Sequence, residues 1–185
     1  MPLIGTAIDD ALGARWEGRG MPRSEDIVSI ANKLEQLIYT DDTHMTIGVA
    51  KPLIASKGFD GEHMAQIFIR NYEIEPWRGY GAGPPRNFRM IREGETWYSA
   101  EDRIYRGGSF GNSSAMRAAP LGLLYFCNLD KLREIAYQPS SITHSDELDR
   151  KGSAFQACTV ALAFNTPSDE GIDREYFLST LQNFI

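Results

Sequence analysis

The chain has 185 residues and a formal net charge of −6 at pH 7, and this length supports one domain with a substantial buried core. The acidic balance, without a cluster of lysine or arginine, excludes a nucleic-acid-binding surface. No apolar run approaches the ~20 residues that a membrane span needs, and no signal peptide precedes the first predicted helix. We therefore expect a single domain over residues 1–185, located in the cytoplasm, with neither nucleic acid nor membrane as a partner.

Residues 3–14 are predicted to form a tightly packed first helix, because their small side chains allow close approach to neighbouring helices. The acidic pair Asp9 and Asp10 requires partners if it is buried there. If the helix continues to Glu17, Asp10 and Glu17 lie two turns apart on one face. The alternative interpretation is that both carboxylates belong to a solvated polar stripe.

A second acidic group follows a loop rich in glycine and proline (residues 18–26) and a predicted helix over residues 27–38, with a partly irregular lead into the acidic residues as the alternative. Residues 40–43, Thr-Asp-Asp-Thr, present the hard oxygen donors that Mg²⁺ or Ca²⁺ selects. The same residue types are favoured at the start of a helix, where a side-chain oxygen accepts a free backbone N–H. Capping needs only one such residue, and a second adjacent carboxylate is electrostatically unfavourable without a cation. The group is a candidate metal site, with helix capping as the alternative.

The segments that follow carry apolar residues at helical spacing. We expect helices over residues 43–55 and 59–72, with Pro52 kinking or ending the first of them. Between residues 75 and 106 the pattern weakens, and a short helix over residues 87–92 is expected within a turn-rich segment. No stretch alternates between apolar and polar residues as a β-strand does, so the predicted fold class is all-α.

Residues 105–117 are rich in glycine and short hydroxyl side chains, and a helix is predicted to begin near Ser113. Backbone N–H groups that converge at a helix N-terminus bind anions, so the segment suits a phosphate or diphosphate. The alternative is a flexible loop between helices with a serine cap. The segment is neither a Walker loop nor a GxGxxG turn after a strand, which excludes those nucleotide-binding folds.

The C-terminal third is predicted to be helical as well. Helices are expected over residues 118–127, 129–137, 152–164 and 169–185. Cys127 and Cys158 lie in apolar runs and are predicted to be reduced core residues. His144 stands at a loop-to-helix junction, where a histidine is more often a cap or a structural hydrogen-bonding group than a catalyst.

Four of these stretches, in this order, carry a resemblance. The chain resembles the ADP-ribosylglycohydrolase family, also called the ADP-ribosyl-acceptor hydrolases or dinitrogenase-reductase-activating glycohydrolases. The family motif G-x-x-x-G-D-A-L-G with a downstream glutamate is matched by residues 5–13 and Glu17, and T-D-D-T by residues 40–43. G-S-x-G-N-G-x-A-M-R-x-A-P-L-G is matched by residues 108–122, and T-H-S-x-x-L-G-x-x-G by residues 143–152. The resemblance covers almost the whole chain.

The resemblance implies a fold and a set of site residues. Family members are all-α, a compact orthogonal helical bundle, and hydrolyse the bond between ADP-ribose and a protein side chain with two Mg²⁺ ions. By the match of motifs, Thr40, Asp41 and Asp42 would be metal ligands. Glu17, Asp41 and Asp42 would be catalytic. The residues expected to bind the ligand are Gly108, Ser109, Phe110, Gly111, Asn112, Met116 and His144.

The chain also departs from the family pattern. The second metal-binding motif of the family, G-x-D-x-D-T-I-G near the C-terminus, does not occur in these residues, so the chain looks like a C-terminally shortened member. Asp9, Ser113 and Asp149 replace family glycines, and a side chain at position 149 is unfavourable if φ is positive there.

Two functions follow from the resemblance and these departures. The first is a Mg²⁺-dependent hydrolase that removes ADP-ribose from modified protein side chains. The alternative is a non-catalytic module that binds ADP-ribose or a protein. A second copy of the chain or a further segment is expected to complete the site.

Overall fold

The computed structural model describes residues 2–104, 111–167, 169 and 171–185, and all regular secondary structure in this part of the chain is helical. The α-helices are α1 (Pro2–Gly13), α2 (Ser24–Ala31), α3 (Asp41–Ser56), α4 (Gly61–Ile74), α5 (Gly83–Arg92), α6 (Ala100–Ile104), α7 (Ala119–Leu124), α8 (Leu129–Ile135), α9 (Glu147–Asn165) and α10 (Arg174–Phe184). Two 3₁₀ helices, η1 (Ala14–Trp16) and η2 (Pro139–Ile142), lie between them. The all-α fold class predicted from the sequence is confirmed.

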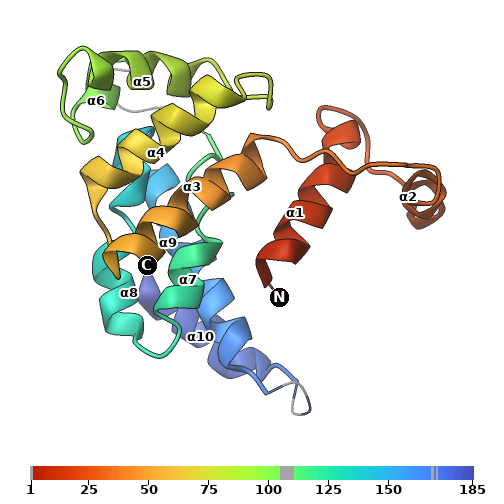
Figure 1. Cartoon of the computed structure of the whole chain (residues 1–185). Helices are drawn as coiled ribbons and strands as arrows, with labels where there is room; N and C mark the ends of the chain where they lie inside the picture. Colours follow the sequence, from red (N-terminus) through yellow and green to blue (C-terminus); the bar gives the residue numbers. More distant parts are fainter. Residues whose placement is uncertain (1, 105–110, 168, 170) are drawn as a thin grey trace.

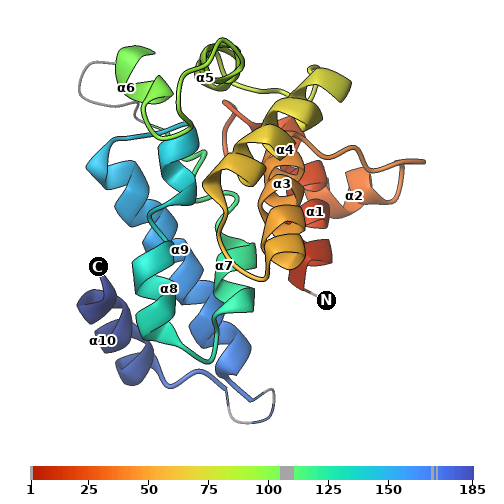
Figure 2. The same cartoon turned by 60° about the vertical axis from the view of Figure 1, so that its left-hand side comes forward.

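The helices α3, α7 and α9 form the middle of the molecule. α3 packs against α4 and α7, and α7 packs in turn against α9. α5 and α6 cover one end of this group, and α8 and α10 lie at the other end (Figures 1 and 2). The buried apolar side chains form one cluster, to which every helix from α3 to α10 contributes.

The N-terminal helices lie to one side of this core (Figure 1). α1 buries only Ala11, and α2 buries no side chain. Burial of apolar surface therefore contributes little to holding α1 against α3, and polar contacts must position it.

Residues 27–38 are helical only in their first part, and the irregular alternative holds for the rest. α2 ends at Ala31, and the residues from Asn32 to Thr40 are not helical. Leu37 and Ile38 are 43% and 64% exposed, so the apolar pattern that suggested a helix finds no partner to pack against. A short helix in water needs such packing to be stable.

The helix predicted to begin near Ser113 is also wrong. Residues 113–117 form turns, and α7 begins at Ala119 with Pro120 in its first turn. A helix that started at Ser113 would place Pro120 in its interior, where the ring clashes with the carbonyl group of residue 116. The helix N-terminus expected near Ser113 is therefore absent, while residues 105–110 of the predicted anion-binding segment lie outside the described residues.

Smaller differences concern prolines and helix ends. α3 continues through Pro52 to Ser56, so the proline does not stop it early. α7 ends at Leu124, which leaves Cys127 exposed rather than in the core, whereas Cys158 is buried in α9; both are free thiols.

The contact between α7 and α9 depends on Gly122. A methyl group on this residue would lie 2.3 Å from the carbonyl oxygen of Ala157 and 2.9 Å from Cβ of Val160. Backbone atoms cannot move aside as a flexible side chain does, so only glycine allows the two helices to approach this closely.

We expect Gly122→Ala to lower the free energy of unfolding by about 2–3 kcal/mol, because α7 must separate from α9. The matched control is Gly152→Ala in α9, where a methyl group meets nothing within 4 Å and should stabilise the helix by about 0.5–1 kcal/mol. Urea unfolding of both variants checks the prediction, and equal effects of the two substitutions would contradict it.

Candidate active site

The start of α3 is held by the carboxylate of Asp10 from α1. Asp10 Oδ2 accepts hydrogen bonds from the backbone N–H of Thr40 at 2.9 Å and of Thr43 at 3.1 Å. The two threonine hydroxyls donate to the same carboxylate, at 2.7 Å from Thr40 and 2.6 Å from Thr43. The partly buried carboxylate of Asp10 therefore accepts four hydrogen bonds from two residues, Thr40 and Thr43, at the start of α3.

These bonds bear on the capping interpretation of the Thr-Asp-Asp-Thr stretch. Thr40 is the N-cap of α3, and its hydroxyl accepts the backbone N–H of Asp42 at 3.4 Å. With Thr40 and Asp10 satisfying the helix terminus, neither Asp41 nor Asp42 is needed as a cap. Capping is real, but it leaves both aspartates available for another role.

The two aspartates share a region of excess negative charge. Burial, followed by repulsion from Asp42, Glu17 and Asp10, raises the pKa of Asp41 to about 6. Burial and repulsion from Asp10 and Glu17 raise the pKa of Asp42 to about 6 as well. Each holds a proton more tightly than a free aspartate does, as expected of carboxylates that lack a nearby positive charge.

Glu17 reaches this region by a different route from the one predicted. α1 ends at Gly13, η1 follows, and Glu17 has an extended backbone, so Asp10 and Glu17 are not on one face of a continuous helix. Glu17 nevertheless lines a groove between α1 and α3. The residues lining the groove are Thr6, Asp9, Asp10, Gly13, Ala14, Trp16, Glu17, Asp42 and Met116.

The second predicted segment meets the first through Met116. Its carbonyl oxygen lies 3.2 Å from the hydroxyl of Thr46, which is also 2.8 Å from the carbonyl oxygen of Asp42. Gly111 and Asn112 are exposed at the start of this segment. Gly108, Ser109 and Phe110, the other predicted ligand-binding residues, lie outside the described residues.

His144 is buried beneath Gly111. A Cβ atom on Gly111 would lie 3.2 Å from His144 Nε2. The ring nitrogen Nδ1 lies 2.8 Å from the hydroxyl of Thr143, which also accepts a hydrogen bond of 2.7 Å from Arg117. Burial and the charge of Arg117 lower the pKa of His144 to about 3, so the ring is neutral at physiological pH.

The aspartate that replaces a family glycine fits its position. Asp149 lies in the first turn of α9, and the only described non-glycine residue with positive φ is Lys57. Its buried carboxylate accepts a hydrogen bond from the hydroxyl of Ser114. The backbone strain considered for a side chain at position 149 does not arise, and Asp149 ties α9 to the turn at residues 113–117.

A turn that was interpreted only as a loop from its sequence also contacts the acidic residues. Arg78 forms two hydrogen bonds with Glu75, and its Nη1 donates to the carbonyl oxygen of Tyr39 at 2.8 Å. Gly79 has φ of +91°, and a Cβ there would lie 3.6 Å from Asp41 Oδ1. The positive φ of Gly79 favours glycine at this position of the Arg-Gly-Tyr-Gly turn.

The acidic residues suit a hard cation only in part. Among the described residues, no group of three or more histidine, cysteine, aspartate or glutamate side chains could hold a metal ion. Asp41 and Asp42 nevertheless provide carboxylate oxygens, which are ligands that Mg²⁺ prefers. Their raised pKa values reflect burial and neighbouring negative charge. The described residues fit one part of a metal site rather than a closed one.

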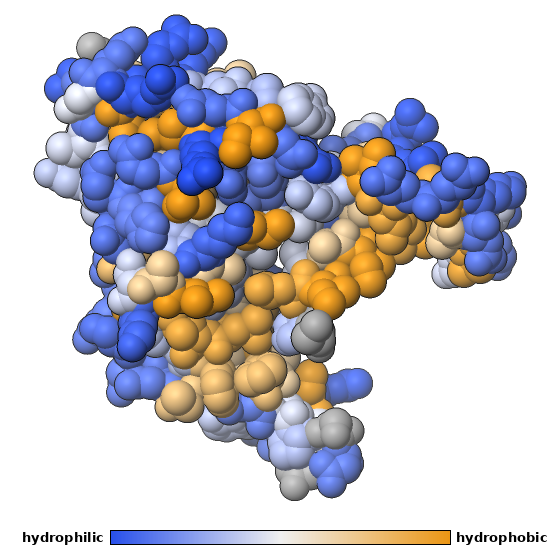
Figure 3. Space-filling model, viewed as in Figure 1, coloured by the Kyte–Doolittle hydropathy of each residue, from blue (hydrophilic) through white to orange (hydrophobic). Residues whose placement is uncertain are grey.

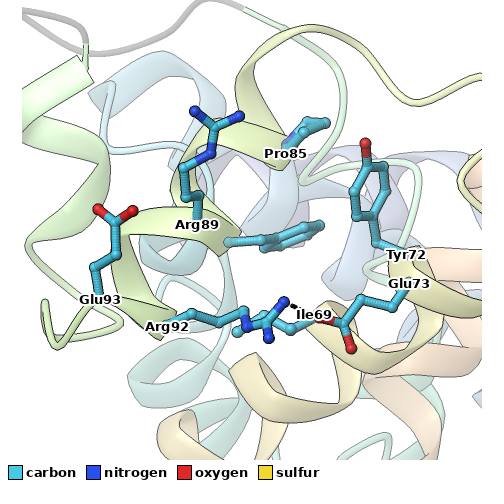
Figure 4. A pocket seen from close by; sticks show the side chains of 8 residues that line it. Ile69, Tyr72, Glu73, Pro85, Arg89, Arg92 and Glu93 are labelled. Atoms are coloured by element: carbon cyan, nitrogen blue, oxygen red, sulfur yellow. Dashed lines mark hydrogen bonds and ion pairs between the residues drawn. The ribbon is translucent and has the colours of Figure 1, made fainter.

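A second hollow lies between α4 and α5, away from the groove lined by Asp42 and Glu17 (Figure 4). Arg89, Arg92, Glu73 and Glu93 line it together with the apolar and aromatic side chains of Ile69, Tyr72, Pro85 and Phe88. Arg92 forms an ion pair with Glu73, and two basic and two acidic side chains leave no net charge. The hollow therefore shows no preference for an anion or a cation.

The surface over α1, α3 and α7 is apolar (Figure 3). A shallow pocket there is lined by Leu3, Ala50, Leu53, Ile54, Pro120, Leu123 and Leu124. Ile54 is 75% exposed and Ile4 is 49% exposed.

Each helix in the described ranges falls short of the length or hydropathy that a membrane crossing requires.

The family model described as ADP-ribosylglycohydrolase matches residues 2–185 of this chain, and the chain belongs to that family. It is 33% identical to the ADP-ribosylhydrolase ARH3 of Homo sapiens and 32% identical to that of Gallus gallus, over 97% of this chain and 52% of each relative. Identity to the protein of the same name from Mus musculus is 30%, over 97% of this chain and 51% of that protein. The chain spans about half the length of the curated relatives it matches.

We expect Asp10→Asn to loosen the first turn of α3, because an amide cannot accept all four hydrogen bonds and its NH₂ group faces donors. The expected loss is about 2 kcal/mol, with faster hydrogen exchange of the Thr40 and Thr43 amides. Asp9→Asn removes the same charge from an exposed neighbour and is the control. Unchanged exchange at Thr43 in Asp10→Asn would show that the carboxylate does not hold the turn.

A pH prediction follows from His144. Its pKa is about 3 in the folded chain against 6.5 for the free side chain, so the unfolded state binds more protons below pH 6.5 and the stabilisation is lost as pH falls. The loss is about 2 kcal/mol between pH 6.5 and 5. His144→Gln removes it, so the stability difference between wild type and this variant should shrink by that amount. A pH-independent difference would contradict a buried neutral His144.

Proposed function

We propose that residues 1–185 form a single ADP-ribosylglycohydrolase-type domain that hydrolyses the bond between ADP-ribose and a protein side chain. Membership of the family and identity to proteins named ADP-ribosylhydrolase support this activity. The observation that carries the proposal is the start of α3, where Thr40 and Asp10 cap the helix and leave Asp41 and Asp42 with raised pKa values. The cytoplasmic location expected from the sequence stays a prediction.

The proposed cofactor is Mg²⁺, held by Thr40, Asp41 and Asp42. When bound, the ion supplies positive charge that polarises ligand oxygens and acidifies a water molecule. Asp10 keeps the three residues in place through its bonds to Thr40 and Thr43. Glu17, exposed in the groove beside Asp42, is proposed to accept a proton from the attacking water. The carboxylates also favour the positive charge that develops at the anomeric carbon of the ribose.

The ligand is proposed to extend from this groove to the segment that begins at residue 108. Gly108, Ser109, Phe110, Gly111 and Asn112 are proposed to surround the diphosphate and distal ribose. Met116, which lines the acidic groove, and His144 beneath Gly111 are proposed to contact the ligand between them. Thr46 supports this continuity, because it lies within hydrogen-bond distance of carbonyl oxygens in both segments.

We further propose that polypeptide beyond the described residues completes the metal site. The second metal-binding motif is absent from this sequence, and the relatives are about twice as long as the matched region. The apolar surface over α1, α3 and α7 offers a place for that polypeptide to pack, whether it is a further segment or a second copy of the chain.

The alternative function is an ADP-ribose-binding module without hydrolase activity. The incomplete set of metal-binding side chains in the described residues favours it. The ligand-binding segment does not depend on a closed metal site, so binding could persist without catalysis. The two functions predict different results in one assay.

The decisive measurement is release of ADP-ribose from proteins modified on arginine or on serine. We expect release with Mg²⁺, its loss in EDTA, and a decrease of about a hundredfold or more in Asp41→Asn. Asp130→Asn, an exposed aspartate of α8 outside the acidic groove, is the control and should retain the wild-type rate. Specific activity that rises with chain concentration would indicate completion by a second copy.

The remaining outcomes separate the two functions. Full activity in EDTA would refute the metal role. Binding of ADP-ribose without any release would establish the binding module instead. Absence of both binding and release would refute both functions and leave only the shared fold.

A further inference from the structure

His144 is the end of a hydrogen-bond chain that begins at a fully buried arginine. Arg117 is 1% exposed, and its Nη2 donates to the hydroxyl of Thr143 at 2.7 Å and to the carbonyl oxygen of Pro139 at 3.1 Å. The Thr143 hydroxyl in turn lies 2.8 Å from His144 Nδ1. All three side chains are buried, and the contacts run from Arg117 in the core to His144 beside the turn at Gly111.

The direction of each bond follows from the donor that starts the chain. A guanidinium group has only donors, so Thr143 Oγ1 must be the acceptor of the bond from Arg117. Among the described residues, the other polar atom in hydrogen-bond contact with this hydroxyl is His144 Nδ1. Donating to Nδ1 is the one bond among these contacts that uses the hydroxyl hydrogen, so the arrangement favours an unprotonated Nδ1.

This arrangement determines what the other ring nitrogen presents. A neutral imidazole carries one hydrogen, so an unprotonated Nδ1 places that hydrogen on Nε2. Nε2 is the atom that lies 3.2 Å from the position of a Cβ on Gly111. The ring thus presents an N–H donor beside Gly111, which belongs to the segment proposed to bind the ligand. The opposite tautomer would present a lone pair there.

Arg117 is itself held from several sides. Its guanidinium lies 5.0 Å from the centroid of the Phe68 ring, and the negative charge of Asp149 favours its charged form. Nε and Nη1 have no hydrogen-bond partner among the described residues, so the bonds to Thr143 and Pro139 fix its orientation. Asp149 also accepts a hydrogen bond from Ser114, three residues before Arg117 in the same turn.

We propose that Arg117 and Thr143 are positioning residues that hold neutral His144 as the Nε2–H tautomer, which donates to an anionic oxygen of a ligand bound at Gly111. The identity of that ligand as ADP-ribose rests on the proposed function. The tautomer itself does not, because it follows from the donors and acceptors of the buried chain. The lone pair of the other tautomer would repel a phosphate oxygen, so the buried chain favours anion binding without adding a second charge to the site.

The test is ¹⁵N NMR of the histidine side chains together with calorimetric titration of ADP-ribose. In the wild type, His144 should show a protonated Nε2 and an unprotonated Nδ1 that accepts a hydrogen bond. Thr143→Val removes the hydroxyl with little change of shape. It should abolish the hydrogen-bonded Nδ1 signature and weaken ADP-ribose binding about tenfold. Thr143→Ser restores a hydroxyl and should recover both properties.

Arg117→Met tests the origin of the chain, since it frees the Thr143 hydroxyl to accept from Nδ1–H. It should shift His144 towards the Nδ1–H tautomer if the variant folds, and the Thr143 pair decides the proposal if it does not. An Nδ1–H tautomer in the wild type would overturn the proposal, as would a Thr143→Val variant with unchanged spectrum and affinity. Failure of the wild type to bind ADP-ribose would refute the proposed ligand, while the tautomer measurement would still decide the positioning role.

Discussion

The acceptance of four hydrogen bonds by Asp10 is the interaction on which the candidate site depends. A carboxylate at a helix N-terminus is favoured by the free N–H groups and by the helix dipole, and hydrogen bonds to a charged acceptor contribute about 1.5–3 kcal/mol each. α1 buries only one residue, so apolar contacts alone would hold it weakly. The same carboxylate therefore attaches α1 to α3 and sets the geometry of Thr40, Asp41 and Asp42.

This attachment brings several carboxylates together at a site without a compensating cation. Asp10 and Glu17 contribute to the raised pKa of both Asp41 and Asp42, so their proximity opposes folding at neutral pH. Natural sequences tolerate such conflicts mainly where function requires them. A bound cation would stabilise the folded state by mass action, and the repulsion in its absence would then increase the response of stability to Mg²⁺.

The two parts of the site are joined by buried polar contacts rather than by a continuous helix. Thr46 connects Met116 to α3, and Asp149 connects Ser114 to α9. Arg117 lies between these contacts and is sensitive to the charges of both Asp149 and Asp41. The segment proposed to bind the ligand is consequently held at its C-terminal end by the core, close to the acidic groove. The chain belongs to the ADP-ribosylglycohydrolase family, which is the basis for interpreting this arrangement as part of a hydrolase site. The chain spans about half the length of its relatives, which is the basis for proposing that other polypeptide completes the site.

Hydrophobic periodicity determined the fold class and the approximate positions of α3, α4 and α9, because buried helices carry their apolar face in the sequence. The four motifs determined the family and the types of residues in the site. Only the tertiary structure decided that residues 32–40 are not helical, and that Thr40 caps α3 while Asp10 of α1 accepts the backbone N–H of Thr43. The hydrogen-bond chain from Arg117 to His144 was equally beyond the sequence. Each of these features depends on contacts between residues distant along the chain. Local pattern reports which side chains are available, whereas the partner that each side chain meets is set by the packing of helices.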